Sequence, residues 1–348
     1  MALDPLARDH YPADRAETAR SLAQRSPLPA RVGNVRFGSA SWTDPTLVRS
    51  GLFYPRGAST AEKRLRYYAS RFSMVEVDAS YYALPTVAQA RSWVERTPDD
   101  FRFNIKAFSA MTGHPVELRA LPKELAGGLP GRMKARKKAR VAELPEELVE
   151  ACWQRFLAAA EPLSEAGKLG AVLLQFPPWF TATRGNARRI VECRTRLGDL
   201  PGAVEFRHRS WLDDSRWARV QDLLRDQGMT YVAVDAPRGF ETALPPWRAV
   251  TNPRLAMVRF HGRNRATWEG GGSTAAERFD HLYTPEELGE WVDGVRELSD
   301  QAEEVHVVMN NCTYDAAQLG GYGIAALLRE ATALLGASGE GTGPPAPP

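Results

Sequence analysis

Short apolar segments alternate with longer amphipathic segments along most of this chain, and this alternation restricts the fold more than any other feature of the sequence. Eight segments of five to seven residues have the length and the β-branched and aromatic content of buried strands. Strands that alternate with helices form parallel sheets, because each crossover helix carries the chain back to the edge where the strand began. Eight such units over about 300 residues predict a single-domain α/β protein, a (β/α)8 TIM barrel.

The predicted strands are Val35–Ala40, Met74–Ala79, Phe101–Ala107, Gly170–Phe176, Ala203–Arg207, Thr230–Asp235, Ala256–His261 and Val305–Asn310. The predicted helices are Ala61–Phe72, Val87–Arg96, Pro145–Ala166, Asn186–Arg196, Ser215–Gln227, Pro285–Ser299 and Ile324–Leu335. An open doubly wound sheet is the alternative, and its dinucleotide-binding form carries Gly-x-Gly-x-x-Gly after the first strand. Residues 38–43 read Gly-Ser-Ala-Ser-Trp-Thr instead, which favours the barrel.

The two ends of the chain differ in composition from this alternating region. Residues 1–34 are polar and contain four prolines. We therefore expect a leader outside the main core, with a short helix around Arg15–Arg25. Residues 336–348 are rich in Gly and Pro and predict a disordered tail. The barrel is then assigned to residues 35–335.

One connection, at about 109–144 after the third strand, is unusually long. It contains no convincing strand or buried helix, and loops of this length inside a compact domain are usually functional or disordered. In a barrel it would lie on the C-terminal face, where active sites occur. It carries a run of basic residues without an acid, which is either an anion-binding insertion or a solvated loop. The basic residues are Arg132, Lys134, Arg136, Lys137, Lys138 and Arg140.

The net charge of the whole chain is +3, so without these six positive charges the remainder carries −3. An anionic partner would therefore meet a local patch rather than the whole surface. Three widely spaced cysteines form no zinc or redox pair, and no apolar run reaches the length of about 20 residues that spans a bilayer. Because the N-terminus also lacks the features of a secretory signal, we expect a cytoplasmic protein without membrane contact. The sequence leaves the oligomeric state open.

Polar residues occupy every second position near the ends of several predicted strands. Glu76 and Asp78 alternate with Val75 and Val77, and the third, fifth and seventh strands repeat this pattern. In a barrel one set of alternate residues faces the helices and the other faces the interior, so polar groups would converge at the C-terminal strand ends. They form either a site or an ion-pair network that holds the sheet together. The candidate catalytic residues are Glu76, Lys106, Glu205, Asp235 and His261.

Further polar and aromatic residues stand at or just after the strand ends. Aromatic faces suit sugars, bases and other planar ligands, and arginine forks suit phosphate groups, although the same aromatics could simply pack the loops. The candidate ligand-binding residues are Trp42, Tyr81, Tyr82, Gln175, Arg207, Trp211, Arg259, Arg263, Asn310 and Asn311.

Three kinds of chemistry remain open for these groups. The carboxylates Glu76, Glu205 and Asp235, together with His261, could ligate one hard divalent ion, although the sequence requires no cofactor. Two carboxylates with different surroundings could instead act as an acid and a base. Lys106 could attack a carbonyl as an amine, or bind an anion.

Seven segments stand at the strand ends, namely Gly38–Trp42, Val75–Pro85, Phe103–Ala107, Leu173–Pro178, Val204–Trp211, Val258–Arg263 and Met309–Asn311. Together they resemble the YecE-like family, a bacterial and archaeal domain of unknown function with a TIM-barrel fold. The resemblance covers about Val35 to Leu335 and implies the barrel, but it supplies no established reaction. This chain differs from the usual pattern at Asp78, where the family usually has Asn, and at Cys312, where His is common.

These observations favour an enzyme that acts on a phosphate-bearing ligand, which could be a nucleic acid, at the C-terminal strand ends. The alternatives are a non-catalytic nucleic-acid-binding protein and a hydrolase or isomerase of sugars or phosphosugars. Nucleic-acid binding would depend on the basic insertion and fall steeply with salt. A small-molecule enzyme would depend on Glu205 and much less on the insertion.

Overall fold

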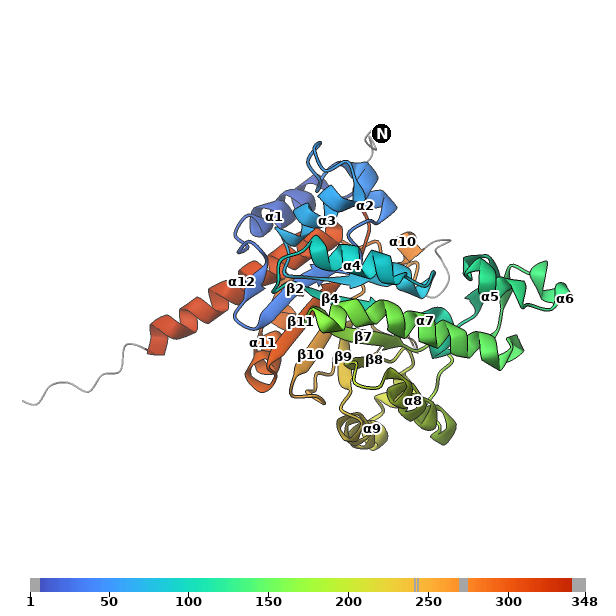
Figure 1. Cartoon of the computed structure of the whole chain (residues 1–348). Coiled ribbons are helices and arrows are strands. Elements are labelled where there is room, and N and C mark those ends of the chain that lie inside the picture. The colour runs from blue at the N-terminus through green and yellow to red at the C-terminus, as the bar shows by residue number, and fades with distance from the viewer. Residues whose placement is uncertain (1–6, 241, 243, 269–274, 340–348) are drawn as a thin grey trace, which may run out of the picture.

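The structure, a computed structural model, describes residues 7–240, 242, 244–268 and 275–339 (Figure 1). Of Arg132, Lys134, Ala275, Ala276 and residues 336–339 it describes the backbone only. No helix within these ranges is both long and apolar enough to cross a membrane.

The described residues form an α/β fold around a curled sheet of nine strands, in the order β1-β2-β11-β10-β9-β8-β7-β4-β3. All neighbouring strands are parallel except β1 (Arg31–Val32), which pairs antiparallel with β2. The eight strands predicted from the sequence are therefore present. They are β2 (Val35–Ser39), β3 (Met74–Val77), β4 (Arg102–Lys106), β7 (Leu169–Gln175), β8 (Gly202–Glu205), β9 (Thr230–Asp235), β10 (Leu255–Phe260) and β11 (Glu304–Met309).

Helices cover the outside of the curled sheet (Figure 1). The longer ones begin at clear signals, such as the Thr284–Glu287 capping box and Pro285 at the start of α11. The short helices α2, α5, α6 and α10 were not predicted. The helices are α1 (Ala13–Ala23), α2 (Pro45–Ser50), α3 (Ala61–Ala69), α4 (Val87–Glu95), α5 (Lys123–Gly127), α6 (Gly131–Lys134), α7 (Glu146–Glu165), α8 (Arg184–Leu197), α9 (Asp214–Asp226), α10 (Ala275–Arg278), α11 (Pro285–Gln301) and α12 (Ala316–Gly339).

The two long edges of the sheet, β2 and β3, approach each other without a ladder between them in the described residues. We call the junction between β2 and β3 the seam. At the N-terminal end of β2 the seam is occupied by β1 and by Ala30, which forms a parallel bridge with Phe72. Toward the C-terminal end of β2 the two strands β2 and β3 touch directly, because a Cβ added at Gly38 would lie 2.1 Å from the carbonyl oxygen of Met74. Only glycine fits this position.

The N-terminal segment differs from the predicted leader. Helix α1 packs on α12, and Leu22 belongs to the main hydrophobic core. Tyr11 also donates a hydrogen bond to Asp280, 2.6 Å away. Polar composition conceals this packing, because the buried face of α1 is narrow and consists of Ala16, Ala19 and Leu22.

The insertion and the C-terminus also differ from expectation. Within 109–144 the short strands β5 (Val116–Glu117) and β6 (Lys138–Ala139) pair antiparallel, and Figure 1 shows α5 and α6 projecting from the sheet. Helix α12 continues to Gly339, four residues into the predicted tail, and residues 340–348 lie outside the described residues.

A buried ion-pair cluster lies inside the sheet near the N-terminal strand ends. Glu304 accepts a hydrogen bond from Arg36 Nε at 2.7 Å and pairs with the His306 ring at 2.7 Å. Burial alone would raise the pKa of Glu304, but His306 and Arg36 lower it to about 2. Burial also lowers the pKa of His306, so the imidazole is neutral here. The lowered pKa of Glu304 stabilises the folded state at neutral pH.

We predict that Glu304→Gln lowers the free energy of unfolding at pH 7 by about 2 kcal/mol. In the unsubstituted protein this contribution is complete above the ordinary glutamate pKa of 4.5 and disappears as the pH falls toward 2. The variant should therefore show a flatter pH dependence in this window, measured by urea unfolding. The neighbouring Glu303→Gln, on an exposed side chain, serves as the control. Equal pH profiles for both variants would contradict the assignment.

Candidate functional site

Arg259 of β10 lies fully buried inside the curled sheet, where its guanidinium group joins two carboxylates. Its Nη2 donates to Glu76 Oε1 of β3 at 2.5 Å and to Asn310 Oδ1 at 3.1 Å, and its Nη1 donates to Glu205 Oε2 of β8. Side chains of alternate strand residues point inward, which is why the three strands meet here. The arginine thereby connects β10 with β3 across the interior.

Glu205 is the most heavily hydrogen-bonded carboxylate of this cluster. Besides Arg259, it accepts from Gln175 Nε2 at 2.6 Å and from Arg207 Nη1 at 3.2 Å. His261 Nε2 lies 3.0 Å from Glu205 Oε1. Asn310 donates to His261 Nδ1 at 2.9 Å, so the imidazole proton belongs on Nε2 and points at Glu205.

The two glutamates have pKa values shifted in opposite directions. Burial raises the pKa of Glu76 above its ordinary value, and Arg259 offsets only part of this effect. Burial would also raise the pKa of Glu205, but Arg259, His261 and Arg207 lower it well below the ordinary value. Burial lowers the pKa of His261 to about 4, against the opposing effect of Glu205. At neutral pH Glu205 is therefore ionised beside a neutral histidine.

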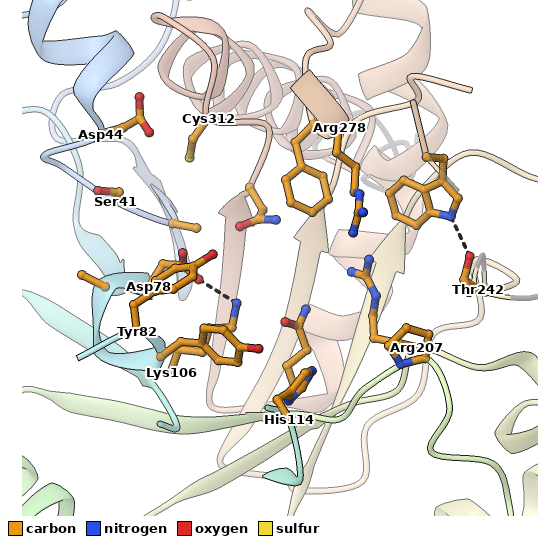
Figure 2. Close-up of a pocket in the computed structure, with 18 of the residues that line it drawn as sticks. Ser41, Asp44, Asp78, Tyr82, Lys106, His114, Arg207, Thr242, Arg278 and Cys312 are labelled. Atoms are coloured by element: carbon orange, nitrogen blue, oxygen red, sulfur yellow. Dashed lines mark hydrogen bonds and ion pairs between the residues drawn. The ribbon is translucent and has the colours of Figure 1, made fainter. Parts of the chain in front are cut away.

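A cavity of about 760 Å³ lies above this cluster at the C-terminal strand ends, and we call it the strand-end pocket (Figure 2). Its cationic lining residues are Lys106, Arg207 and Arg278, and its acidic ones are Asp44 and Asp78. Gln175 and Asn310 reach it from the buried cluster below. The aromatic lining residues are Tyr81, Tyr82, His114, Trp179, Trp268 and Phe279.

Arg207 and Arg278 face each other on one side of the strand-end pocket. Figure 2 shows their guanidinium ends directed toward one another, and the positive charge of Arg278 contributes to a lowered pKa of Arg207, whose main cause is burial. Arg207 is anchored by Glu205 and lies over the Trp268 ring, 5.0 Å from its centroid. Among the described residues no carboxylate pairs with Arg278, and its Nε has no hydrogen-bond partner.

Lys106 lies on the other side of the strand-end pocket. Its Nζ donates to Asp78 Oδ1 at 2.7 Å and lies 4.7 Å from the centroid of the Tyr81 ring. Burial, together with the nearby positive charges of Lys106 and Arg207, lowers the pKa of His114 to about 3. The lysine–aspartate pair therefore faces the cavity beside a neutral imidazole.

The structure places two of the predicted site residues in a separate cluster. The carboxylate of Asp235 accepts from Arg263, Tyr283 and Trp291, with the Tyr283 hydroxyl at 2.6 Å and the indole nitrogen at 2.9 Å. Neither Asp235 nor Arg263 lines the strand-end pocket. Because Arg263 also pairs with Glu290 of α11, this cluster attaches a helix to the sheet.

Three further predicted ligand-binding residues have packing roles. Trp42 is buried edge-to-face against Trp93, and its carbonyl oxygen accepts from a tyrosine hydroxyl. Trp211 stacks on Phe206 and donates to the Phe180 carbonyl. Asn311 donates to the carbonyl of His281 at 2.7 Å. The alternative hypothesis from the sequence, that the aromatic residues pack the loops, describes Trp42 and Trp211.

Acidic residues of the same segment partly neutralise the basic insertion. Arg136 forms two hydrogen bonds with Glu143, at 2.9 and 3.1 Å, and Lys138 lies 3.3 Å from Glu117. The Lys137 and Arg140 side chains are exposed, and those of Arg132 and Lys134 lie outside the described part. Arg140 lines a second cavity of about 910 Å³, which shares only Trp179 with the strand-end pocket.

The metal site considered from the sequence is not assembled. Among the described residues no group of three or more His, Cys, Asp or Glu side chains could hold a metal ion. Asp235 belongs to the separate cluster, while Glu205 and His261 are bonded to each other and to cationic neighbours.

Several pocket residues were missed as site candidates by sequence reasoning. Asp44 stands in the loop after β2 and precedes Pro45, a combination that signals a helix start rather than a ligand contact. Arg278 lies far along the connection after β10, and nothing in its local sequence distinguishes it from other surface arginines. Only the three-dimensional arrangement brings both residues to the pocket.

We predict that Arg259→Met lowers the free energy of unfolding by at least about 3 kcal/mol, because it leaves buried carboxylates uncompensated. The triple variant that adds Glu76→Gln and Glu205→Gln should recover part of this loss. Chemical denaturation measures both effects. As a control, Arg225→Met removes an exposed ion pair with Asp222 and should cost no more than about 1 kcal/mol. Equal losses from the two single variants would contradict the assignment.

Comparisons with known proteins agree with this architecture. The model of the family described as "Protein of unknown function DUF72" matches residues 36–343. UPF0759 protein YunF of Bacillus subtilis (strain 168) is 30% identical over 280 residues, which cover 80% of this chain and 88% of that protein. UPF0759 protein YecE of Escherichia coli O157:H7 is 35% identical over 253 residues, which cover 67% of this chain and 76% of that protein.

Two solved structures of DUF72 family proteins are similar to the whole fold. One, from Enterococcus faecalis V583, has a TM-score of 0.68 at 27% identity and covers 84% of this chain and 95% of its own. Another, from Thermotoga maritima MSB8, has a TM-score of 0.63 at 29% identity and covers 86% of this chain and 99% of its own. The resemblance seen in the strand-end segments is therefore confirmed, and the chain belongs to the DUF72 family of proteins of unknown function.

Proposed function

We propose that this protein is an enzyme that acts on a phosphate-bearing ligand held in the strand-end pocket. The observation that carries the proposal is the pair of guanidinium groups of Arg207 and Arg278, directed at each other on one side of the cavity (Figure 2). Two close positive charges repel each other, and an anion between them relieves the repulsion. Arginine forks match the oxygens of phosphate, so a phosphate group is the anion that this arrangement fits best.

Lys106 and Asp78 are the groups we propose for the chemical step, because they face the cavity as a hydrogen-bonded pair. In this role the ammonium group of Lys106 stabilises negative charge on a ligand oxygen, and the Asp78 carboxylate takes up a proton. Both functions need contact with the ligand, which these two side chains can reach.

Glu76, Glu205 and His261 are better suited to positioning than to catalysis. Their side chains are at most 1% exposed beneath the strand-end pocket. Glu205 holds Gln175 and Arg207 by direct hydrogen bonds, and His261 holds Asn310. In our proposal the buried cluster fixes the groups that contact the ligand and takes no part in proton transfer to it.

We also propose that the curled sheet is a full (β/α)8 barrel. Support comes from the seam, where β1 and the contact of Gly38 with Met74 fill the gap between β2 and β3. A cytoplasmic location is likewise our proposal. It rests on three cysteines that are all free, which suits a reducing compartment.

A single-stranded nucleic acid is a second candidate ligand, either as a substrate or as a partner that is bound without a reaction. Trp179 is 59% exposed and lines both the strand-end pocket and the second cavity, where Arg140, Arg189 and Arg196 also lie. An exposed aromatic face between two cationic cavities is a feature of sites that stack bases along a phosphate backbone.

We predict that Arg278→Ala weakens binding of inorganic phosphate at least tenfold, since it removes one half of the guanidinium pair. Isothermal titration calorimetry at fixed salt measures the dissociation constant. Arg219→Ala, on the exposed face of α9, should leave binding within twofold of the unsubstituted protein. Unchanged binding in Arg278→Ala would rule out the guanidinium pair as the anion site.

The insertion separates the two candidate ligands in a further experiment. A variant with Lys137→Ala, Lys138→Ala and Arg140→Ala should bind inorganic phosphate normally, because these side chains do not line the strand-end pocket. If the same variant loses binding to a labelled single-stranded oligonucleotide that the unsubstituted protein retains at moderate salt, the nucleic-acid candidate gains support. If the oligonucleotide does not bind at all, the small-molecule candidate is favoured.

A further inference from the structure

The strand-end pocket has two sides of opposite character. Arg207 and Arg278 form the cationic side, whereas the loop after β2 and the turn after β3 supply hydroxyl and carboxylate groups on the other (Figure 2). We call this second side the acidic wall and define it as Ser41, Thr43, Asp44 and Asp78. A ligand that fills the cavity meets both sides.

Asp44 is held in a fixed orientation at the acidic wall. Its Oδ1 caps helix α2 by accepting from Thr46 N at 2.8 Å, from Leu47 N at 3.2 Å and from the Thr46 hydroxyl at 2.5 Å. No described residue donates to the other oxygen, Oδ2, and the side chain lines the cavity. A rigid carboxylate with one unused oxygen is a ready acceptor for a ligand hydroxyl group.

The other members of the acidic wall extend the same chemistry. Asp78 gives one carboxylate oxygen to Lys106, and Ser41 Oγ accepts from the Thr43 backbone N–H. The hydroxyl groups of Ser41 and Thr43 can each donate and accept. Tyr81 and Tyr82 also line the cavity, and their rings offer apolar faces.

Lys106 offsets the charge of Asp78, but Asp44 pairs with no cation among the described residues and repels a phosphate group from the acidic wall, so an anionic ligand fits best with its phosphate at the arginines. The remainder of the ligand then lies against clustered acceptors and aromatic rings. Neighbouring hydroxyl groups on a compact ring satisfy these acceptors, whereas a purely apolar body would leave them unpaired. A cavity of about 760 Å³ has room for a phosphorylated monosaccharide.

We propose that the strand-end pocket takes a sugar monophosphate, with the phosphate between Arg207 and Arg278 and the sugar hydroxyls on Asp44 and Asp78. This inference rests on the proposed function, since it requires the phosphate site. It goes further by naming the substrate class and the orientation in the cavity, and by assigning Asp44 as the residue that distinguishes a sugar from a bare phosphate.

The test uses Asp44→Asn, which keeps an oxygen that can cap α2 but removes the charge. Binding of glucose 6-phosphate, ribose 5-phosphate and inorganic phosphate is measured by calorimetry. We expect at least one sugar phosphate to bind the unsubstituted protein at least tenfold more tightly than inorganic phosphate. Asp44→Asn should reduce this preference to less than threefold and change the dissociation constant of inorganic phosphate by less than twofold.

Asp213→Asn is the matched control, because Asp213 caps α9 through Ser215 in the same way but does not line the strand-end pocket. It should leave the sugar preference intact, and thermal unfolding should show that both variants remain folded. Phosphoethanolamine serves as the amine comparator. If it binds as tightly as the better sugar phosphate, the acidic wall holds an ammonium group and the inference is wrong.

The outcomes separate this inference from the function on which it rests. Inorganic phosphate that binds, together with sugar phosphates that bind no more tightly, contradicts the inference alone. A loss of all binding in Asp44→Asn, phosphate included, contradicts it as well, since Asp44 then acts on the phosphate site. No detectable binding of any phosphate compound contradicts both proposals.

Discussion

The contact of Arg259 with Glu76 and Glu205 is the interaction on which the rest of the structure depends. Arg259 and Glu205 come from β10 and β8, which are separated only by β9, whereas Glu76 comes from β3 at the end of the sheet order and meets them because the sheet is curled. Each charged group would be very costly to bury alone, so the three stabilise one another or not at all. The interior of the sheet is therefore organised by charge, while the apolar residues of the same strands face the helices.

The buried cluster also determines what reaches the strand-end pocket. Glu205 binds four donors, and one of them, Arg207, belongs to the cationic side of the cavity. Because Glu205 stays ionised and His261 stays neutral, neither of these two groups changes its charge over the neutral pH range. The charged groups that can contact a ligand line the strand-end pocket above this cluster, and they include Lys106, Asp78 and Arg278.

The sequence predicts the strands well, because each combines a buried apolar face with clear turn signals, and alternation correctly indicates that Glu76, Glu205 and Arg259 point inward. It fails where distant segments meet. Asp235 ends its strand as Glu205 does, but it lies in register with Phe260 rather than with the inward-facing Arg259, so it points to the helix side, where Arg263, Tyr283 and Trp291 bind it. Arg278 carries no local signal, since its place depends on how a long connection folds back. The packing of α1 on α12 is hidden in the same way.

The seam between β2 and β3 has a dynamic consequence for the strand-end pocket. Where Gly38 meets Met74 the strands are in contact without a ladder, so local opening at this place breaks fewer hydrogen bonds than at any other junction of the described parallel strands. Asp44 follows β2 and Asp78 follows β3, so the two carboxylates lie on opposite sides of the seam. Local opening of the seam would therefore change the distance between these two carboxylates of the acidic wall.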